Sequence, residues 1–226
     1  MYGEGRAEEL VGEAMAGRRD EAFIVSKVYP HNASRRGVVA ACERSLQRLR
    51  TDRIDLYLLH WRGSVPLAET MAGFEALRRA GKIRHYGVSN LDLADMEELA
   101  SVTSGGGVQV NQVLYNLGRR GIEWDLLPWL RTRRIAVMAY SPVEQARLLS
   151  DARLRRLARA AGLTAAQVAI AWLLRQPDDI VIPKTATRAK LEENLQALDV
   201  ALTEAQLDEI DAAFPPPSEA EPLAML

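Results

Sequence analysis

The 226-residue sequence contains a single cysteine, Cys42, which excludes a disulfide framework and a cysteine-rich metal site. Its 29 basic and 30 acidic residues give a formal net charge of −1, so neither sign is in excess to attract nucleic acid or an anionic membrane. No apolar run approaches the ~18 residues that a membrane span needs, and the N-terminus lacks the pattern of a signal peptide. We therefore expect a cytoplasmic protein that acts on a small molecule.

Lysine is also scarce, because only four of the 29 basic residues are lysines and arginine supplies the rest. The lysine ammonium is a compact charge that can tune the pKa of a neighbouring group, a task for which the planar guanidinium is less suited. Two of the four, Lys27 and Lys184, come at or just after the ends of predicted strands. These two lysines are therefore candidates for a functional site.

Apolar periodicity predicts an unbroken alternation of helices and strands. The predicted strands are 22–28, 54–60, 84–89, 108–113, 135–140 and 180–183. The predicted helices are 6–18, 36–49, 66–80, 93–102, 124–132, 152–161, 164–176, 188–198 and 204–213. The capping boxes Thr164-x-x-Gln167 and Thr203-x-x-Gln206 mark two helix starts independently of the periodicity.

Six apolar strands that alternate with helices indicate a parallel sheet in an α/β protein. A doubly wound sheet and a (β/α)8 TIM-type barrel are the two candidate architectures. No Gly-x-Gly-x-x-Gly motif follows a strand, and polar residues end almost every strand, which favours the barrel. A closed barrel has eight strands, so we expect that the first one or two β/α units are missing and that Met1 is internal to a longer protein.

The predicted barrel domain covers residues 1–214 and is incomplete at its N-terminus. The segment that follows it, from Pro215 to Pro222, is rich in proline and acidic residues and cannot sustain a helix or a strand. Residues 215–226 are therefore predicted to form a flexible tail.

Titratable side chains stand at the carboxyl ends of two predicted strands, Lys27 at the first and His60 at the second. The carboxyl ends of parallel strands form the functional face of β/α folds. A single histidine at a strand end is often structural, so neither residue decides the function when it is taken alone.

Several motifs in chain order resemble the aldo-keto reductase family. They are Tyr2-Gly3-x-Gly5, the strand-end Lys27, the Asp-Leu-Tyr-Leu-Leu-His run 55–60, the Gly-Lys-Ile-Arg-His-Tyr-Gly-Val-Ser-Asn run 81–90 and Ile182-Pro183-Lys184-Thr185. The resemblance extends from Met1 to about Phe214. It implies a (β/α)8 barrel that uses NADP(H), without a metal, to interconvert small carbonyl compounds and alcohols.

The resemblance assigns the catalytic roles to Tyr2, Lys27 and His60. A phenol with a pKa near 10 holds its proton too tightly at neutral pH, and an ammonium beside it stabilises the phenolate. Tyr2 is then the acid, Lys27 its tuner and His60 the group that orients the carbonyl. The family's fourth catalytic residue, an aspartate, lies at a position before Met1. A catalytically impaired nucleotide-binding or regulatory fragment is therefore the alternative function.

The resemblance also assigns the residues that bind the cofactor. Those at the nicotinamide are Ser89, Asn90 and Gln112, with Tyr140 stacked on the ring. Those along the pyrophosphate are Ser141, Pro142, Val143 and Gln145, followed by Ala146 where relatives often carry glycine. Those at the adenosine 2′-phosphate are Lys184 and Thr185, assisted by Arg188 or Lys190, with Asn194 near the adenine.

Other interpretations stay open for several of these aromatic and basic residues. Tyr140 could also be an aromatic residue of the core. Trp61 either lines a substrate pocket or is an ordinary loop residue. The tryptophans 124, 129 and 172 are predicted to lie in the core. The arginine-rich run 153–159 is predicted to be a solvated helix face rather than an anion site. The sequence leaves the oligomeric state and the identity of the carbonyl substrate undetermined.

Overall fold

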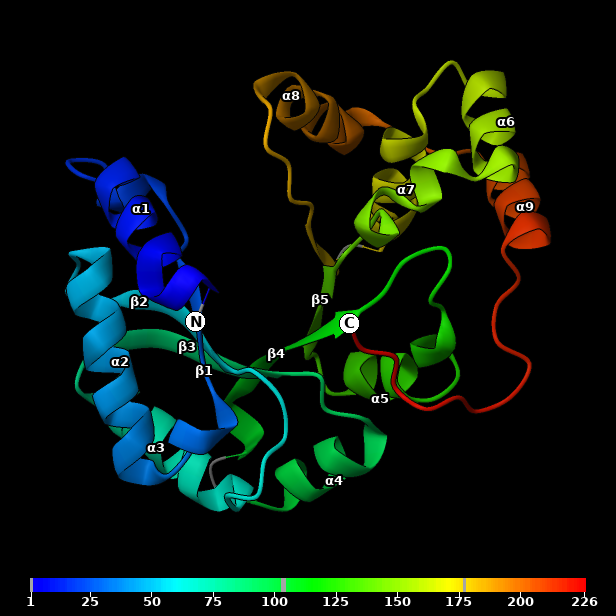
Figure 1. The fold of residues 1–226 in the computed structure, drawn as a ribbon. Coiled ribbons are helices and arrows are strands. Elements are labelled where there is room, and N and C mark those ends of the chain that lie inside the picture. The colour runs from blue at the N-terminus through cyan, green and yellow to red at the C-terminus, as the bar shows by residue number, and fades with distance from the viewer. Residues whose placement is uncertain (1, 103–104, 177) are drawn as a thin grey trace. The chain divides into compact units, whose positions relative to one another are not determined.

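The computed structural model describes residues 2–102, 105–176 and 178–226 (Figure 1). Contacts within the chain divide it into two units, Met1–Asn111 and Gln112–Leu226. The boundary falls inside the strand β4 (Val108–Leu114). Hydrogen bonds link the six strands in chain order from β1 to β6.

The first unit is built on three parallel strands, β1 (Val25–Val28), β2 (Ile54–Leu59) and β3 (Ile83–Ser89). Its helices are α1 (Arg6–Ala14), α2 (Arg35–Leu49), α3 (Leu67–Arg79) and α4 (Leu93–Ser101). Helix α2 packs against α1 and α3, and the three lie along one side of these strands (Figure 1). All six residues of β2 are buried, which explains why every residue of the strand except Asp55 is apolar. The Asp55 carboxylate is paired with Arg19 at 2.7 Å.

The close approach of neighbouring strands in this unit depends on Gly87 of β3. A Cβ atom at this position would lie 2.5 Å from the carbonyl oxygen of Val110 and 2.8 Å from Cδ2 of Leu58. Because a strand packed this tightly has no room for a side chain, only glycine fits between these neighbours.

The second unit contains the parallel pair β5 (Ala136–Tyr140) and β6 (Ile180–Ile182), in which Met138 is opposite Ile180. Its helices are α5 (Leu126–Thr132), α6 (Ala152–Ala160), α7 (Ala165–Leu174), α8 (Arg188–Gln196) and α9 (Glu204–Ala213). Helix α7 packs against α6 and α8, and eight of its ten residues are buried, which makes it the central helix of this unit. Both predicted capping boxes are present, at the starts of α7 and α9.

These strands confirm the predicted parallel α/β architecture. The closed eight-stranded barrel and the missing β/α units stay predictions. The predicted helix 6–18 and strand 22–28 are too long, because the chain turns between Ala14 and Val25. Arg19 holds this turn by donating hydrogen bonds to the carbonyl oxygens of Ala22 and Arg53.

The three tryptophans predicted to lie in the core differ in burial: Trp172 is buried, Trp129 is half-buried and Trp124 is exposed. Trp172 is fully buried as predicted, and the guanidinium groups of Arg120 and Arg175 lie over its ring at 5.0 and 4.0 Å from the centroid. The prediction that Trp124 lies in the core is wrong, since its side chain is 50% exposed. The reason is that α5 starts only at Leu126, so Trp124 precedes the buried face of that helix.

Within the described ranges, no single helix is long and apolar enough to cross a membrane. Helices α6 and α7, which meet at a bend of 84°, reach the necessary length and apolar composition only when they are taken together. The same ranges contain no cluster of three histidine, cysteine or acidic side chains that could hold a metal ion. Residues 215–226 form neither helix nor strand. The flexibility of this segment stays a prediction.

Candidate active site

The carboxyl ends of β1, β2 and β3 bring together three of the predicted site residues. Lys27 lies opposite Leu58 in the register of β1 with β2, and the backbone nitrogen of His60 donates a hydrogen bond to the Val28 oxygen at 3.0 Å. The Asn90 side chain then donates to the His60 carbonyl oxygen at 3.2 Å. Lys27, His60 and Asn90 therefore lie at the same edge of the first unit's strands.

Burial changes the acid–base behaviour of two of these groups. It lowers the pKa of Lys27 to about 8. Burial first, and then the positive charge of Lys27, lower the pKa of His60 to about 4. At neutral pH, the lysine is mostly protonated and the imidazole is neutral.

An aromatic cluster surrounds the imidazole of His60. The ring of Trp61 lies 4.4 Å from it between centroids, and the ring of Tyr29 lies 5.5 Å from it. Tyr29 also contacts Trp61 edge-on at 5.4 Å and stacks on His31 at 5.2 Å. Trp61 is 38% exposed, so one face of the cluster is open to a ligand. The sequence did not indicate that Tyr29 and His31 belong to this cluster, because no motif marks them beyond their closeness to Lys27.

The predicted acid, Tyr2, begins a 3₁₀ segment, η1 (Tyr2–Gly5), and its side chain lies outside the described residues. The backbone explains the glycines of the motif. Gly5 has a φ of 101°, and a Cβ atom there would lie 2.6 Å from Cδ of Arg48. The Tyr-Gly-x-Gly sequence therefore forms a tight left-handed turn that leads into α1.

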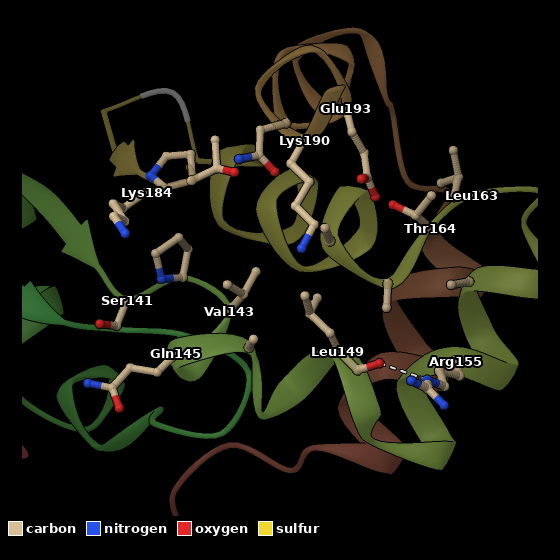
Figure 2. Close-up of a pocket in the computed structure, with 18 of the residues that line it drawn as sticks. Ser141, Val143, Gln145, Leu149, Arg155, Leu163, Thr164, Lys184, Lys190 and Glu193 are labelled. Atoms are coloured by element: carbon tan, nitrogen blue, oxygen red, sulfur yellow. Dashed lines mark hydrogen bonds between the residues drawn. The ribbon is translucent and has the colours of Figure 1, made fainter. Parts of the chain in front are cut away.

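The second unit contains a cavity of about 810 Å³ between β6, α8 and the loop after β5 (Figure 2). Eight of the residues predicted to bind the cofactor line it. They are Ser141, Pro142, Val143, Gln145, Lys184, Thr185, Lys190 and Asn194. Figure 2 shows Lys190 and Glu193 extending from α8 into the cavity.

The charge of this cavity is strongly positive. Four basic residues, Lys184, Lys190, Arg155 and Arg159, line it with one acidic residue, Glu193. Arg155 donates a hydrogen bond from Nε to the Leu149 carbonyl oxygen at 2.7 Å, which fixes its position (Figure 2). A large cavity with this excess of cations fits a ligand that carries several phosphates, and a dinucleotide phosphate meets both requirements.

The prediction that the run 153–159 forms a solvated helix face is confirmed, because its arginines are all exposed. Two of these arginines, Arg155 and Arg159, also line the cavity, which the sequence did not indicate. Helix α6 buries Leu154, Leu157 and Ala158, as its amphipathic pattern predicts. The two arginines lie beside this buried face, and the periodicity does not distinguish a residue at the border of a cavity from a solvated one.

The remaining residues predicted for the cofactor do not line this cavity. Gln112 is buried and donates from Nε2 to the sulfur of Met138, and Tyr140 ends β5. Arg188 is 91% exposed and pairs with Glu192 at 2.8 Å. Ser89 and Asn90 belong to the first unit, where the Asn90 side chain donates to the Ser89 hydroxyl at 3.2 Å.

The loop after β5 has an unusual backbone. Ser141, Glu144, Gln145 and Ala146 have φ angles of 51°, 49°, 53° and 71°. This left-handed conformation costs a non-glycine residue roughly 1 kcal/mol. Ala146 therefore takes part in a left-handed turn although it has a side chain.

Comparisons with known proteins identify the family of this chain. Residues 1–214 match the sequence model of the Aldo/keto reductase family. Methylglyoxal reductase YeaE of Escherichia coli (strain K12) is 48% identical over 231 residues, which cover 100% of this chain and 81% of that protein. Glyoxal reductase of Bacillus subtilis (strain 168) is 35% identical over 194 residues, which cover 86% of this chain and 69% of that protein.

The same similarity is found among solved structures. The aldo/keto reductase from Klebsiella pneumoniae in complex with NADP and acetate is 46% identical and superposes with a TM-score of 0.97. The superposition covers 100% of this chain and 82% of that one. Because the family model matches residues 1–214 and the relatives are similar over most of their length in both sequence and fold, the chain belongs to the aldo/keto reductase family.

Proposed function

We propose that this protein reduces small aldehydes and ketones, including α-dicarbonyl compounds, to alcohols with NADPH. The observation that carries the proposal is the cavity of the second unit, with Lys184 and Lys190 among its basic residues. The names of the methylglyoxal and glyoxal reductases support a small dicarbonyl substrate. The NADP complex of the Klebsiella relative supports the cofactor.

The cavity residues would hold the dinucleotide by charge and by backbone approach. Lys184, Thr185 and Lys190 would bind the 2′-phosphate, which NADH lacks, and Asn194 would lie near the adenine. The loop residues Ser141, Pro142, Val143 and Gln145 would follow the pyrophosphate. Ser89, Asn90, Gln112 and Tyr140 would contact the nicotinamide. Arg188 would assist at the 2′-phosphate only from the surface, because its side chain is almost fully exposed.

NADPH supplies a hydride to the carbonyl carbon when it is bound. The breaking C–O π bond leaves negative charge on the oxygen, which must receive a proton as the charge grows. Tyr2 would donate that proton from its phenol. Lys27, largely protonated below its pKa of about 8, would stabilise the phenolate that remains. His60, neutral because its pKa is about 4, would donate a hydrogen bond to the carbonyl oxygen without competing as an acid.

The first experiment measures binding and turnover on the same preparation. NADPH and NADH are titrated by fluorescence, and oxidation of NADPH is followed with methylglyoxal as the substrate. We expect NADPH to bind more tightly than NADH, and methylglyoxal to be reduced. NADPH binding without turnover on any aldehyde would instead favour the regulatory alternative, and failure to bind NADPH would refute the proposal.

Two variants separate the roles of the residues. Tyr2→Phe is expected to abolish turnover and to leave NADPH binding unchanged, so retained turnover would refute the assignment of the acid. Lys184→Ala is expected to weaken NADPH binding about tenfold to a hundredfold, the range expected for a lost charge-assisted hydrogen bond, with little effect on NADH. Lys82→Ala is the matched control, because this lysine is at the surface and pairs with Glu43 at 3.7 Å.

A further inference from the structure

One residue of the loop after β5 behaves differently from its neighbours. Of the six residues from Ser141 to Ala146, five line the basic cavity and Glu144 does not. Its side chain is only 8% exposed. A buried carboxylate directly behind a cavity for phosphates must be neutralised, because it would otherwise repel them.

Two residues from the segment after β4 hold the Glu144 carboxylate. The Asn116 side chain donates from Nδ2 to one carboxylate oxygen at 2.8 Å. Arg119 approaches the other oxygen with Nε at 3.1 Å and with Nη2 at 3.0 Å. The negative charge of Glu144 is therefore paired by two residues that do not line the cavity.

Asn116 connects this carboxylate to the backbone of the same loop. Its Nδ2 also donates to the Ser141 carbonyl oxygen at 2.9 Å, and its Oδ1 accepts a hydrogen bond from the Gly118 nitrogen at 2.9 Å. Asn116 is fully buried, and both ends of its amide have partners. Asn116 therefore fixes the backbone of Ser141 and the side chain of Glu144 relative to each other.

The backbone between these points needs such a restraint. Glu144, Gln145 and Ala146 are three consecutive non-glycine residues in the left-handed region. Such residues rarely adopt this conformation unless their surroundings hold them in it. The side-chain carboxylate of Glu144 anchors the first of these three residues. The backbone carbonyl oxygen of Glu144 accepts a hydrogen bond from the Arg147 nitrogen at 3.0 Å.

We propose that Glu144 is a positioning residue which, through Asn116 and Arg119, holds the loop Ser141–Ala146 in the conformation that receives the pyrophosphate of NADPH. This inference rests on the proposed function, since it concerns the same cavity. Glu144 does not touch the cofactor. It determines where the backbone of Gln145 and Ala146 meets the phosphates.

The test compares two ligands on the variants Glu144→Ala and Glu144→Gln by calorimetric titration. NADPH carries the pyrophosphate, whereas adenosine 2′-monophosphate carries only the adenine, the ribose and the 2′-phosphate. We expect Glu144→Ala to raise the Kd of NADPH at least tenfold, equivalent to about 1.4 kcal/mol, and that of adenosine 2′-monophosphate less than twofold. Glu144→Gln keeps the shape but loses the ion pair with Arg119, so it should raise the Kd of NADPH by a smaller factor.

Glu123→Gln is the matched control, because Glu123 is another largely buried glutamate of the same unit and does not line the cavity. It accepts hydrogen bonds from the Tyr115 hydroxyl at 2.7 Å and from Nη2 of Arg120 at 2.8 Å. This variant should lower the melting temperature without changing the Kd of NADPH.

Equal weakening of both ligands by Glu144→Ala, or no weakening of either, would overturn the positioning role. Loss of NADPH binding in the unmodified protein is a separate result, because it would refute the proposed function itself and this inference with it.

Discussion

Replacing Lys27 with methionine is expected to stabilise the folded protein while it abolishes carbonyl reduction. Burial lowers the pKa of Lys27 from the ordinary value of 10.5 to about 8. Because the folded pKa lies below the unfolded one, folding disfavours the protonated form. The resulting destabilisation is present in full below pH 8 and is lost as the pH rises from 8 to 10.5.

The size of this effect follows from the difference between the two pKa values. A difference of one corresponds to 1.36 kcal/mol, so protonated Lys27 destabilises the protein by roughly 3 kcal/mol at pH 7. At pH 9.5 somewhat less than half of that remains, because Lys27 is then almost fully deprotonated in the folded state while the unfolded lysine still holds most of its proton. Methionine has a similar length and no charge, so Lys27→Met removes the desolvation cost and keeps most of the packing.

The assay is unfolding in urea at pH 7 and at pH 9.5, followed by circular dichroism, together with methylglyoxal turnover at pH 7. We expect Lys27→Met to raise the free energy of unfolding by a few kcal/mol at pH 7 and by somewhat less than half as much at pH 9.5. The control Lys82→Met changes an exposed lysine and should alter stability by less than about 0.5 kcal/mol. A Lys27→Met protein that is less stable than the unmodified one at pH 7 would refute the claim that this charge is held at a cost.

Three other predictions concern the titratable groups and one buried ion pair. Because the pKa of His60 is about 4 and that of Lys27 about 8, kcat/KM should be flat from pH 5 to 7 and fall above about pH 8; an inflection near pH 6.5 would contradict this. Burial raises the pKa of Asp179 to about 6, so Asp179→Asn should stabilise the protein against urea at pH 8, an advantage that disappears as the pH falls through 6 towards 4. Arg120→Met leaves the largely buried carboxylate of Glu123 without its ion pair and should cost about 3–5 kcal/mol in unfolding free energy, whereas a loss below about 1 kcal/mol would show that this pair is dispensable.

The sequence predicts the order and type of the elements because their burial follows simple periods. β2 is buried along its whole length, and five of its six residues are apolar, Asp55 being the exception. Helix ends were placed best where a side chain caps the backbone, as Thr164 and Thr203 do. They were placed worst between Ala14 and Val25, where α1 ends ahead of Gly17, which has a φ of 75°, and where Arg19 then holds a turn by hydrogen bonds. Periodicity contains no signal for such contacts.

The site was predictable only in part, for a related reason. Lys27, His60 and Lys184 lie at or near strand ends, where the chain order of a parallel sheet identifies candidate functional positions. The contacts of Glu144 with Arg119 and Asn116 join residues 25 and 28 positions apart. A glutamate in a polar loop has the sequence signature of a solvated residue, so only the fold reveals that it is buried.

Burial alone does not separate a functional charge from a structural one, and Asp179 shows why. Burial shifts the pKa values of Asp179, Lys27 and His60 alike. Asp179 precedes β6, at the amino end of that strand, whereas Lys27 and His60 lie at carboxyl ends. If position decides the role, Asp179→Asn and Lys27→Met should both stabilise the protein at pH 8, but only Lys27→Met should abolish reduction. Loss of activity in Asp179→Asn with NADPH binding intact would show that position at the strand end is the wrong criterion.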